Sequence, residues 1–120
     1  VWTMASGTMV QSHESFTHSF ARTGIEIHGT DGSIYAQNIM RQEPGGSVTL
    51  IDMQGEHEIA FDTHNMYHRA LHRFTEATLG HGAPSADGID GVKSLAVALA
   101  VREAAQTGRT RTVDYSGVPQ

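Results

Sequence analysis

The spacing of apolar residues changes once along this chain, near Asp62, and this change constrains the fold more than any other feature. Before it, β-branched and aromatic residues recur in short runs between Gly, Asp and Asn, which is typical of strands joined by turns. After it, apolar residues recur at every third or fourth position, which is typical of helices. Because the strands precede the helices and do not alternate with them, the sequence predicts an α+β fold.

The first half of the chain is expected to form an open, mostly antiparallel β-sheet. Ser6-Gly7, Thr30-Asp31-Gly32 and Met53-Gln54-Gly55 are short connections. They suit antiparallel hairpins, since glycine supplies the positive φ that a tight reversal requires. Six strands are expected, near residues 1–5, 8–18, 24–28, 33–37, 47–52 and 56–61.

Two helices are expected in the second half, packed on one face of the sheet. The first carries a narrow apolar stripe that begins at Tyr67 and ends at Gly80. The second runs from Gly88 to about Thr107, with Asp87 as its N-cap and Gly108 in the position of a C′ glycine. This second helix is apolar almost all round, and one sheet can cover only one of its sides. A further covering surface is therefore expected.

The composition argues against several kinds of function. At 120 residues the chain fits one domain. Its net charge is −5 and Lys93 is its only lysine, whereas nucleic-acid binding needs clustered Lys and Arg. Without cysteine it offers no disulfide or thiolate site, and its longest apolar run is far shorter than the ~20 residues of a bilayer span. We therefore expect a cytoplasmic protein with neither a nucleic-acid nor a membrane partner.

Two patterns resemble ligand sites but are better explained without a ligand. His64, His68 and His72 lie four residues apart, and paired histidines at this spacing can chelate zinc. No carboxylate completes the set at helical spacing, so a solvated helix face is the preferred interpretation and no metal site is expected. Residues 80–85 imitate a glycine-rich dinucleotide loop, but they follow a helix and not a strand, so no cofactor-binding residues are expected there.

The predicted strand at residues 8–18 is unusual because it has polar side chains on both faces. Alternation places His13 and Ser15 on one face, and Glu14 and His18 on the other. A core strand would show one apolar face. Two interpretations remain open: the strand borders a wet cleft or polar interface, or it lies at a sheet edge or subunit contact.

Three segments of the chain together resemble the C-terminal domain of the Gfo/Idh/MocA family of NAD(P)-dependent oxidoreductases. They are residues 19–37, 45–52 and 67–109, and they cover nearly the whole chain. As in that family, a strand ends in a Gly-Thr-Asp-Gly hairpin, here Gly29 to Gly32, and a late helix pair ends in Gly108-Arg109.

The resemblance implies that residues 1–120 are the C-terminal substrate and oligomerisation domain of a dehydrogenase. Such an enzyme transfers hydride between NAD or NADP and a sugar, inositol or related polyol. The family carries its cofactor on a Rossmann domain with a Glu-Lys-Pro motif, and its catalytic Asp and His on a helix before the present segment. This chain contains neither Glu-Lys-Pro nor an Asp-x-x-x-His pattern. We therefore expect a fragment without the Rossmann domain, with no catalytic residue and no NAD(P) binding of its own.

The resemblance also nominates a substrate-binding segment, because in the family the corresponding strand end and loop come near the substrate. Polyols need convergent hydrogen-bond donors and acceptors. A homodimer or higher homo-oligomer is implied as well, with the uncovered sheet face buried against a second copy. The rival interpretation is a free-standing association or small-ligand-binding module. The nominated substrate-binding residues are His18, Ser19, Phe20 and Arg22.

Overall fold

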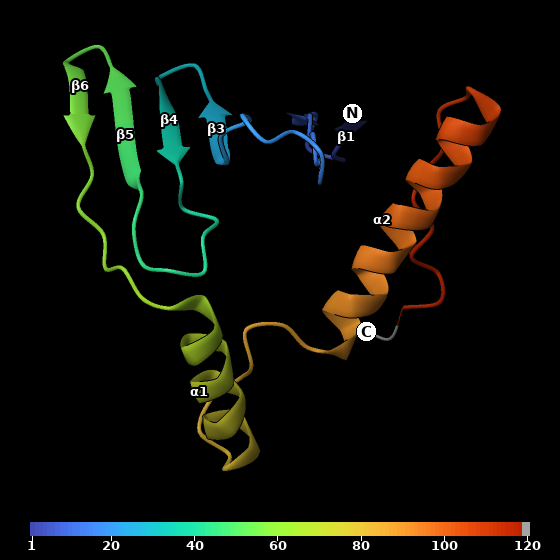
Figure 1. Ribbon diagram of the computed structural model, residues 1–120. Helices are drawn as coiled ribbons and strands as arrows, with labels where there is room; N and C mark the ends of the chain where they lie inside the picture. Colours follow the sequence, from blue (N-terminus) through green and yellow to red (C-terminus); the bar gives the residue numbers. More distant parts are fainter. Residues whose placement is uncertain (119–120) are drawn as a thin grey trace. The chain divides into compact units, whose positions relative to one another are not determined.

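A computed structural model of the chain describes residues 1–118 and divides it into two units, Val1–Thr63 and His64–Gln120. All the described strands lie in the first unit and both helices lie in the second (Figure 1). The predicted α+β class is therefore confirmed.

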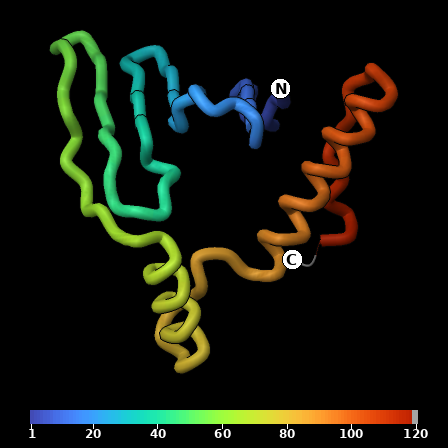
Figure 2. The backbone as a smooth tube through the Cα atoms, viewed as in Figure 1, coloured from blue at the N-terminus to red at the C-terminus, as the bar shows by residue number. Residues whose placement is uncertain are grey.

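The strands of the first unit form two antiparallel sheets. β1 (Trp2–Thr3) and β2 (Met9–Val10) make a small hairpin. The larger sheet is open, has the order β3-β4-β5-β6, and is antiparallel throughout, as expected for strands joined by short turns (Figure 2). Its members are β3 (Gly24–His28), β4 (Gly32–Gln37), β5 (Ser47–Asp52) and β6 (Gly55–Glu58).

The prediction of a long strand at residues 8–18 is wrong. Only Met9–Val10 pairs there, and residues 11–23 have no strand structure. The polar character of both faces explains the difference, since a strand is held in a sheet largely by an apolar face packed against neighbours. The strand expected at residues 1–5 is likewise reduced to Trp2–Thr3, and the last strand ends at Glu58, before the predicted residue 61.

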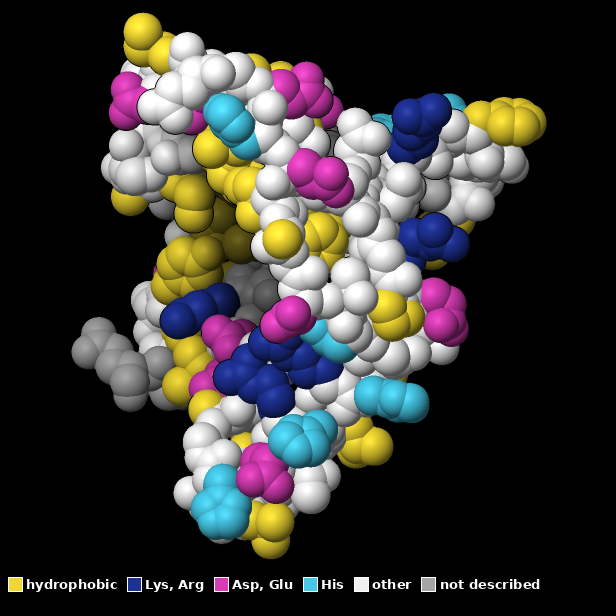
Figure 3. All heavy atoms as spheres, turned by 90° about the vertical axis from the view of Figure 1, so that its left-hand side faces the viewer, with side chains coloured by type: hydrophobic (Ala, Val, Ile, Leu, Met, Phe, Trp, Pro, Cys, Tyr) yellow, Lys and Arg dark blue, Asp and Glu magenta, His cyan; other side chains and the backbone are white. Residues whose placement is uncertain are grey.

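The larger sheet has one apolar and one polar face. Because side chains alternate along a strand, the observed register assigns every residue to a face. Ala36 is the only buried hydrophobic residue in the part of the chain that the structure describes, and many large hydrophobic side chains lie at the surface (Figure 3). The apolar face contains Ile25, Ile27, Ile34, Ala36, Val48 and Leu50, with Asp52 and His57 at one end; the polar face contains Glu26, His28, Ser33, Tyr35, Gln37, Ser47, Thr49, Glu56 and Glu58, together with Ile51.

The connection between β4 and β5 depends on Gly46. Its φ is +102°, a backbone conformation that residues with a side chain rarely adopt. A Cβ at this position would lie 2.6 Å from the carbonyl oxygen of Gln37, closer than two such atoms can approach. Only glycine fits here, so this residue fixes the path by which the chain returns to pair β5 with β4.

Both helices begin at capping residues that satisfy their first free N–H groups. The side chain of Asn65 accepts hydrogen bonds from the N–H groups of Tyr67 and His68 at the start of α1 (Met66–Thr78). The helix α2 (Gly88–Thr107) has the predicted bounds and the predicted N-cap at Asp87. No residue of either helix is buried, so their packing on the sheet stays a prediction.

The N-cap of α2 gives a testable prediction. Asp90 N–H donates to Asp87 Oδ1 at 2.9 Å, and Asp87 N–H donates back to Asp90 Oδ2 at 3.0 Å. Replacing Asp87 with alanine is expected to lower the stability of the first turn of α2 by about 1 kcal/mol. Amide hydrogen exchange in this turn would measure the loss. Asp87→Asn is the matched control, because asparagine also caps helices, and equal exchange in both variants would contradict the assignment.

Neither helix among residues 1–118 has the length and the apolar content that a membrane-spanning helix requires.

Candidate functional site

The four nominated substrate-binding residues lie in the irregular segment between β2 and β3. His18, Ser19, Phe20 and Arg22 are all exposed, and Phe20 is 101% exposed. Ser19 N–H donates to the carbonyl oxygen of Thr17, and Ala21 N–H donates to that of His18, each at 3.2 Å. These bonds bend the chain, so His18, Ser19 and Phe20 lie on one exposed turn, and Arg22 follows directly after it.

The side chains of this turn are free to bind. The rings of His13 and His18 lie 5.5 Å apart at their centroids and are tilted by 49°. Within residues 1–118, the side chains of Ser19, Phe20 and Arg22 form no hydrogen bond or ion pair. The segment therefore presents hydroxyl, imidazole and guanidinium donors beside an exposed aromatic ring. A polyol site needs hydrogen-bond donors and acceptors that converge on the ligand, and this segment alone does not provide such an arrangement.

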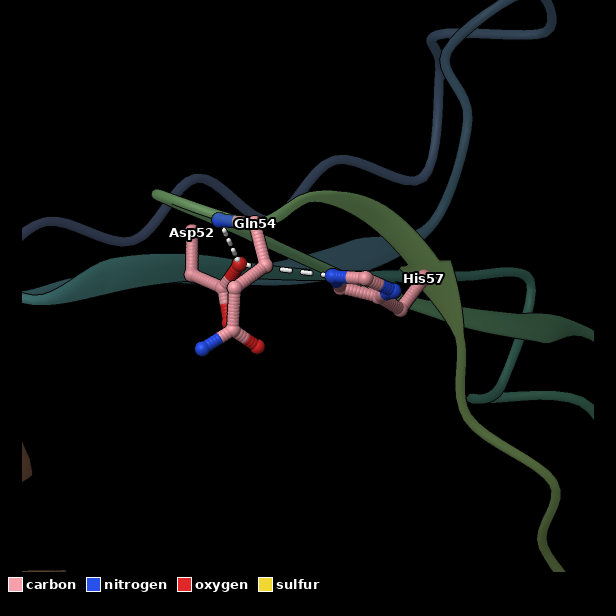
Figure 4. Close-up of polar contacts among 3 residues, drawn as sticks. All are labelled: Asp52, Gln54 and His57. Carbon is pink, nitrogen blue, oxygen red and sulfur yellow. Dashed lines mark hydrogen bonds and ion pairs between the residues drawn. The ribbon is translucent and has the colours of Figure 1, made fainter.

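The β5–β6 hairpin holds a polar group that the sequence reading did not identify as a unit. Asp52 Oδ1 accepts a hydrogen bond from Gln54 N–H at 2.7 Å and lies 3.3 Å from His57 Nε2 (Figure 4). The side chains of Asp52 and His57 are 21% and 45% exposed. A carboxylate in this position can orient an imidazole, but no hydroxyl or thiol group accompanies the pair. The contacts of Asp52 with Gln54 and His57 therefore stabilise the β5–β6 hairpin.

A second polar group lies on the polar face of the sheet. His28 Nδ1 lies 3.0 Å from Ser33 Oγ, and His28 Nε2 lies 3.5 Å from Glu26 Oε2. The ring of Tyr35 meets the His28 ring edge-on at 5.6 Å. The order Ser-His-Glu resembles a hydrolase triad, but the His28 and Glu26 side chains are 57% and 64% exposed. The serine lies on a regular strand and not on the sharp turn that exposes a nucleophile, so this is a polar surface cluster.

The three spaced histidines of the second unit do not form one helical row. His64 precedes the N-cap, and its Nε2 lies 3.0 Å from Arg69 Nη1. His68 and His72 lie within α1. No group of three or more potential metal ligands comes together among the described residues. That no metal binds here stays a prediction.

The segment after α2 is tied to the helix by charge. Arg111 Nε lies 2.8 Å from Glu103 Oε1, as an ion pair without hydrogen-bond alignment. Further along, the Ser116 backbone N–H donates to Asp114 Oδ1 at 2.8 Å and lowers the pKa of that carboxyl below its usual value. Asp114 also lines an open groove along α2, whose walls mix small apolar with charged side chains. None of these groups is arranged for proton transfer to a ligand.

Comparison with known proteins identifies the chain's relatives. Residues 2–114 match the family model of the C-terminal alpha/beta domain of the Gfo/Idh/MocA oxidoreductase family. Over 109 residues the chain is 49% identical to 1,5-anhydro-D-fructose reductase from Ensifer adhaerens. The alignment covers 91% of this chain and 33% of the reductase, so the chain spans about a third of the length of that relative.

Proposed function

Because this chain belongs to the Gfo/Idh/MocA oxidoreductase family, we propose that it is the C-terminal, substrate-facing part of an NAD(P)-dependent enzyme that acts on a sugar or related polyol. The observation that carries the proposal is the 49% identity with a sugar reductase over 91% of the chain. Identity at this level, spread over both units, supports a shared substrate class. The proposed role of the chain is to close the substrate pocket.

The nicotinamide would supply the hydride, but the described residues do not fit this cofactor. A dinucleotide site needs a strand, a glycine-rich turn and a helix N-terminus in that order. Here the Gly29–Gly32 turn leads from β3 into β4, while the loop at Gly80 follows α1. We therefore assign cofactor binding to a Rossmann domain elsewhere in the protein and derive no step through it. The proposed cofactor of the intact protein is NAD or NADP, and a cytoplasmic location stays a prediction.

The residues of this chain would bind and orient the substrate. The guanidinium of Arg22 and the hydroxyl of Ser19 can donate hydrogen bonds to sugar hydroxyl groups, and the ring of Phe20 can cover the apolar face of a sugar ring. All three side chains lack a polar partner among residues 1–118, so binding a ligand breaks no existing contact. The proposed contribution of this segment is therefore substrate affinity and orientation.

A spectrophotometric assay of the intact protein tests the proposed function. The protein is mixed with NADPH or NADH and with a candidate substrate. The first candidate is 1,5-anhydro-D-fructose, after which the related reductase is named, and the others are further carbonyl sugars and polyols. We expect the absorbance of the reduced nicotinamide to fall with at least one carbonyl sugar and not in its absence. If neither nucleotide reacts with any compound, the free-standing binding module becomes the better interpretation.

The expected two-fold dimer can be tested through the polar face of the sheet. That face carries Glu26, Glu56 and Glu58, and the four strands β3 to β6 contain no Lys or Arg. In a two-fold contact the same surface meets itself, so these carboxylates repel one another across it. We expect light scattering of the intact protein to show a dimer that strengthens as salt is added, because salt screens the repulsion between like charges. A strict monomer at high concentration would remove this contact.

A further inference from the structure

The dipeptide Asp-Gly occurs three times, at Asp31, Asp87 and Asp90. At such a site the glycine nitrogen can attack the carboxyl carbon of the aspartate, because glycine has no Cβ to block the approach. A C–N bond forms, the carboxyl C–OH bond breaks, and water leaves with the amide proton. Water then opens the resulting five-membered succinimide at either carbonyl, which gives back aspartate or gives isoaspartate. No oxidant or cofactor is consumed.

We propose that Asp31 is a site of spontaneous isoaspartate formation in this protein, and that the capping box of α2 protects Asp87 and Asp90 from the same reaction. The proposal rests on the different surroundings of three chemically identical dipeptides, and it is independent of the proposed enzymatic function.

At Asp31 both reacting groups are free. The residue is exposed in the connection between β3 and β4, and its carboxyl group forms no hydrogen bond within residues 1–118. The turn is closed by Gly29 N–H, which donates to the carbonyl oxygen of Gly32 at 2.9 Å. Antiparallel pairing alternates, so the Gly32 N–H also points toward β3, away from β5. The return bond from Gly32 to Gly29 does not occur in the described structure, and this nitrogen has no partner across the turn.

At Asp87 and Asp90 both carboxylates are engaged, and at Asp90 the attacking nitrogen of the next residue is engaged as well. Each carboxylate accepts the backbone N–H of the other residue, at 2.9 and 3.0 Å. Gly88 is the first residue of α2, and Gly91 N–H already donates to the carbonyl oxygen of Asp87 at 3.2 Å. Attack on either carboxyl therefore requires the first helical turn to open. Local opening of this kind costs free energy, so only a small population of open molecules can react and the reaction is slower.

Isomerisation at Asp31 would disturb the sheet. Isoaspartate adds one methylene to the main chain, directly before Gly32. This glycine is held tightly against β5, since even a Cβ on it would lie 2.8 Å from the carbonyl oxygen of Ile51 and 3.3 Å from Asp52 Cβ. Gly32 pairs with Asp52, whose carboxylate holds His57. The extra methylene should therefore weaken the pairing of β4 with β3 and with the adjacent end of β5.

Peptide mapping of the aged intact protein tests the proposal. Trypsin cuts after Arg22, Arg41, Arg73 and Lys93, so residues 23–41 report on Asp31 and residues 74–93 report on the other two sites. The protein is held at neutral pH and physiological temperature, and isoaspartate is quantified by enzymatic methylation and electron-transfer fragmentation. We expect it to accumulate roughly fivefold faster in residues 23–41, since a helix cap is worth about 1 kcal/mol, which corresponds to a factor of about five.

Two variants and one condition serve as controls. Asp31→Glu should abolish the product in residues 23–41, because glutamate would have to close a less favourable six-membered ring. Asp31→Asn should increase it, because ammonia leaves an amide more readily than water leaves an acid. In urea the three sites should react at similar rates. Equal rates at the three sites in the folded protein would overturn the proposal, and so would a folded Asp31 that stays unmodified while the urea sample reacts.

Discussion

Replacing Arg22 with alanine in the intact protein is expected to lower kcat/KM for the proposed sugar substrate by roughly tenfold or more, the effect of losing one charged hydrogen bond. Arg22 lies two residues before β3, and its guanidinium group is exposed and unpaired in the described structure. Its five N–H donors are thus available to sugar hydroxyl groups. Steady-state kinetics with the substrate varied at saturating cofactor would measure the change.

Two further variants separate binding from stability. Arg41, in the connection between β4 and β5, is also exposed, so Arg41→Ala removes an equal charge at a site with no proposed role. Its kinetics should not change. Arg22→Lys keeps the charge but loses the planar donor geometry, so part of the activity should return. If Arg22→Ala leaves kcat/KM unchanged at an unchanged melting temperature, the segment from His18 to Arg22 does not bind the substrate.

The helices were the most predictable part of the fold because their signals are local. Asp87, Asp90 and Gly108 mark the ends of α2, and the structure places its first and last residues where these signals predict. The start of α1 was less clear. Its cap is Asn65 and its first residue is Met66, so a helical row that includes His64 begins two residues too early.

The length of a strand could not be predicted from composition alone. Residues 11–18 contain strand-forming types, yet only Met9–Val10 pairs, because pairing depends on an apolar face and a neighbouring strand. The sequence identifies residues that could form a strand, but it does not show which other strand they would pair with. The helix-sheet packing has the same difficulty, since the apolar residues are identified and the surface that covers them is not.

The polar groups of the sheet were predictable in principle. A two-residue turn at Thr30 and Asp31 pairs His28 with Ser33, which the register confirms. The turn at Met53 and Gln54 similarly brings Asp52 and His57 to the same face. Counting outward from each turn would have found both contacts. The nominated substrate segment has no such local signal, because its donors converge only on a ligand or on another part of the protein.

The 120-residue chain by itself is expected to bind neither NAD⁺ nor NADP⁺ and to catalyse no redox reaction. Gly80 and Gly82 have φ values of +82° and +91°, so their loop has a glycine-dependent path, but it follows α1 and precedes α2 without an intervening strand. Backbone N–H groups leaving a helix end are not directed at a pyrophosphate as those leaving a strand are. Lys93, the only lysine, lies on α2 and is exposed, with no proton-transfer partner in the described residues.

Calorimetric titration of the chain with each nucleotide should therefore be flat, while the intact protein should bind one of them. Circular dichroism of the titrated sample would establish that α1 and α2 are formed, so that a flat titration reports on the binding site and not on unfolding. This control is needed because Ala36 is the only buried hydrophobic residue described. Micromolar binding by the folded chain would contradict the assignment of the cofactor to another domain. The loop at Gly80 and the N-terminus of α2 would then be the places to look, since the free N–H groups of a helix start can hold a phosphate.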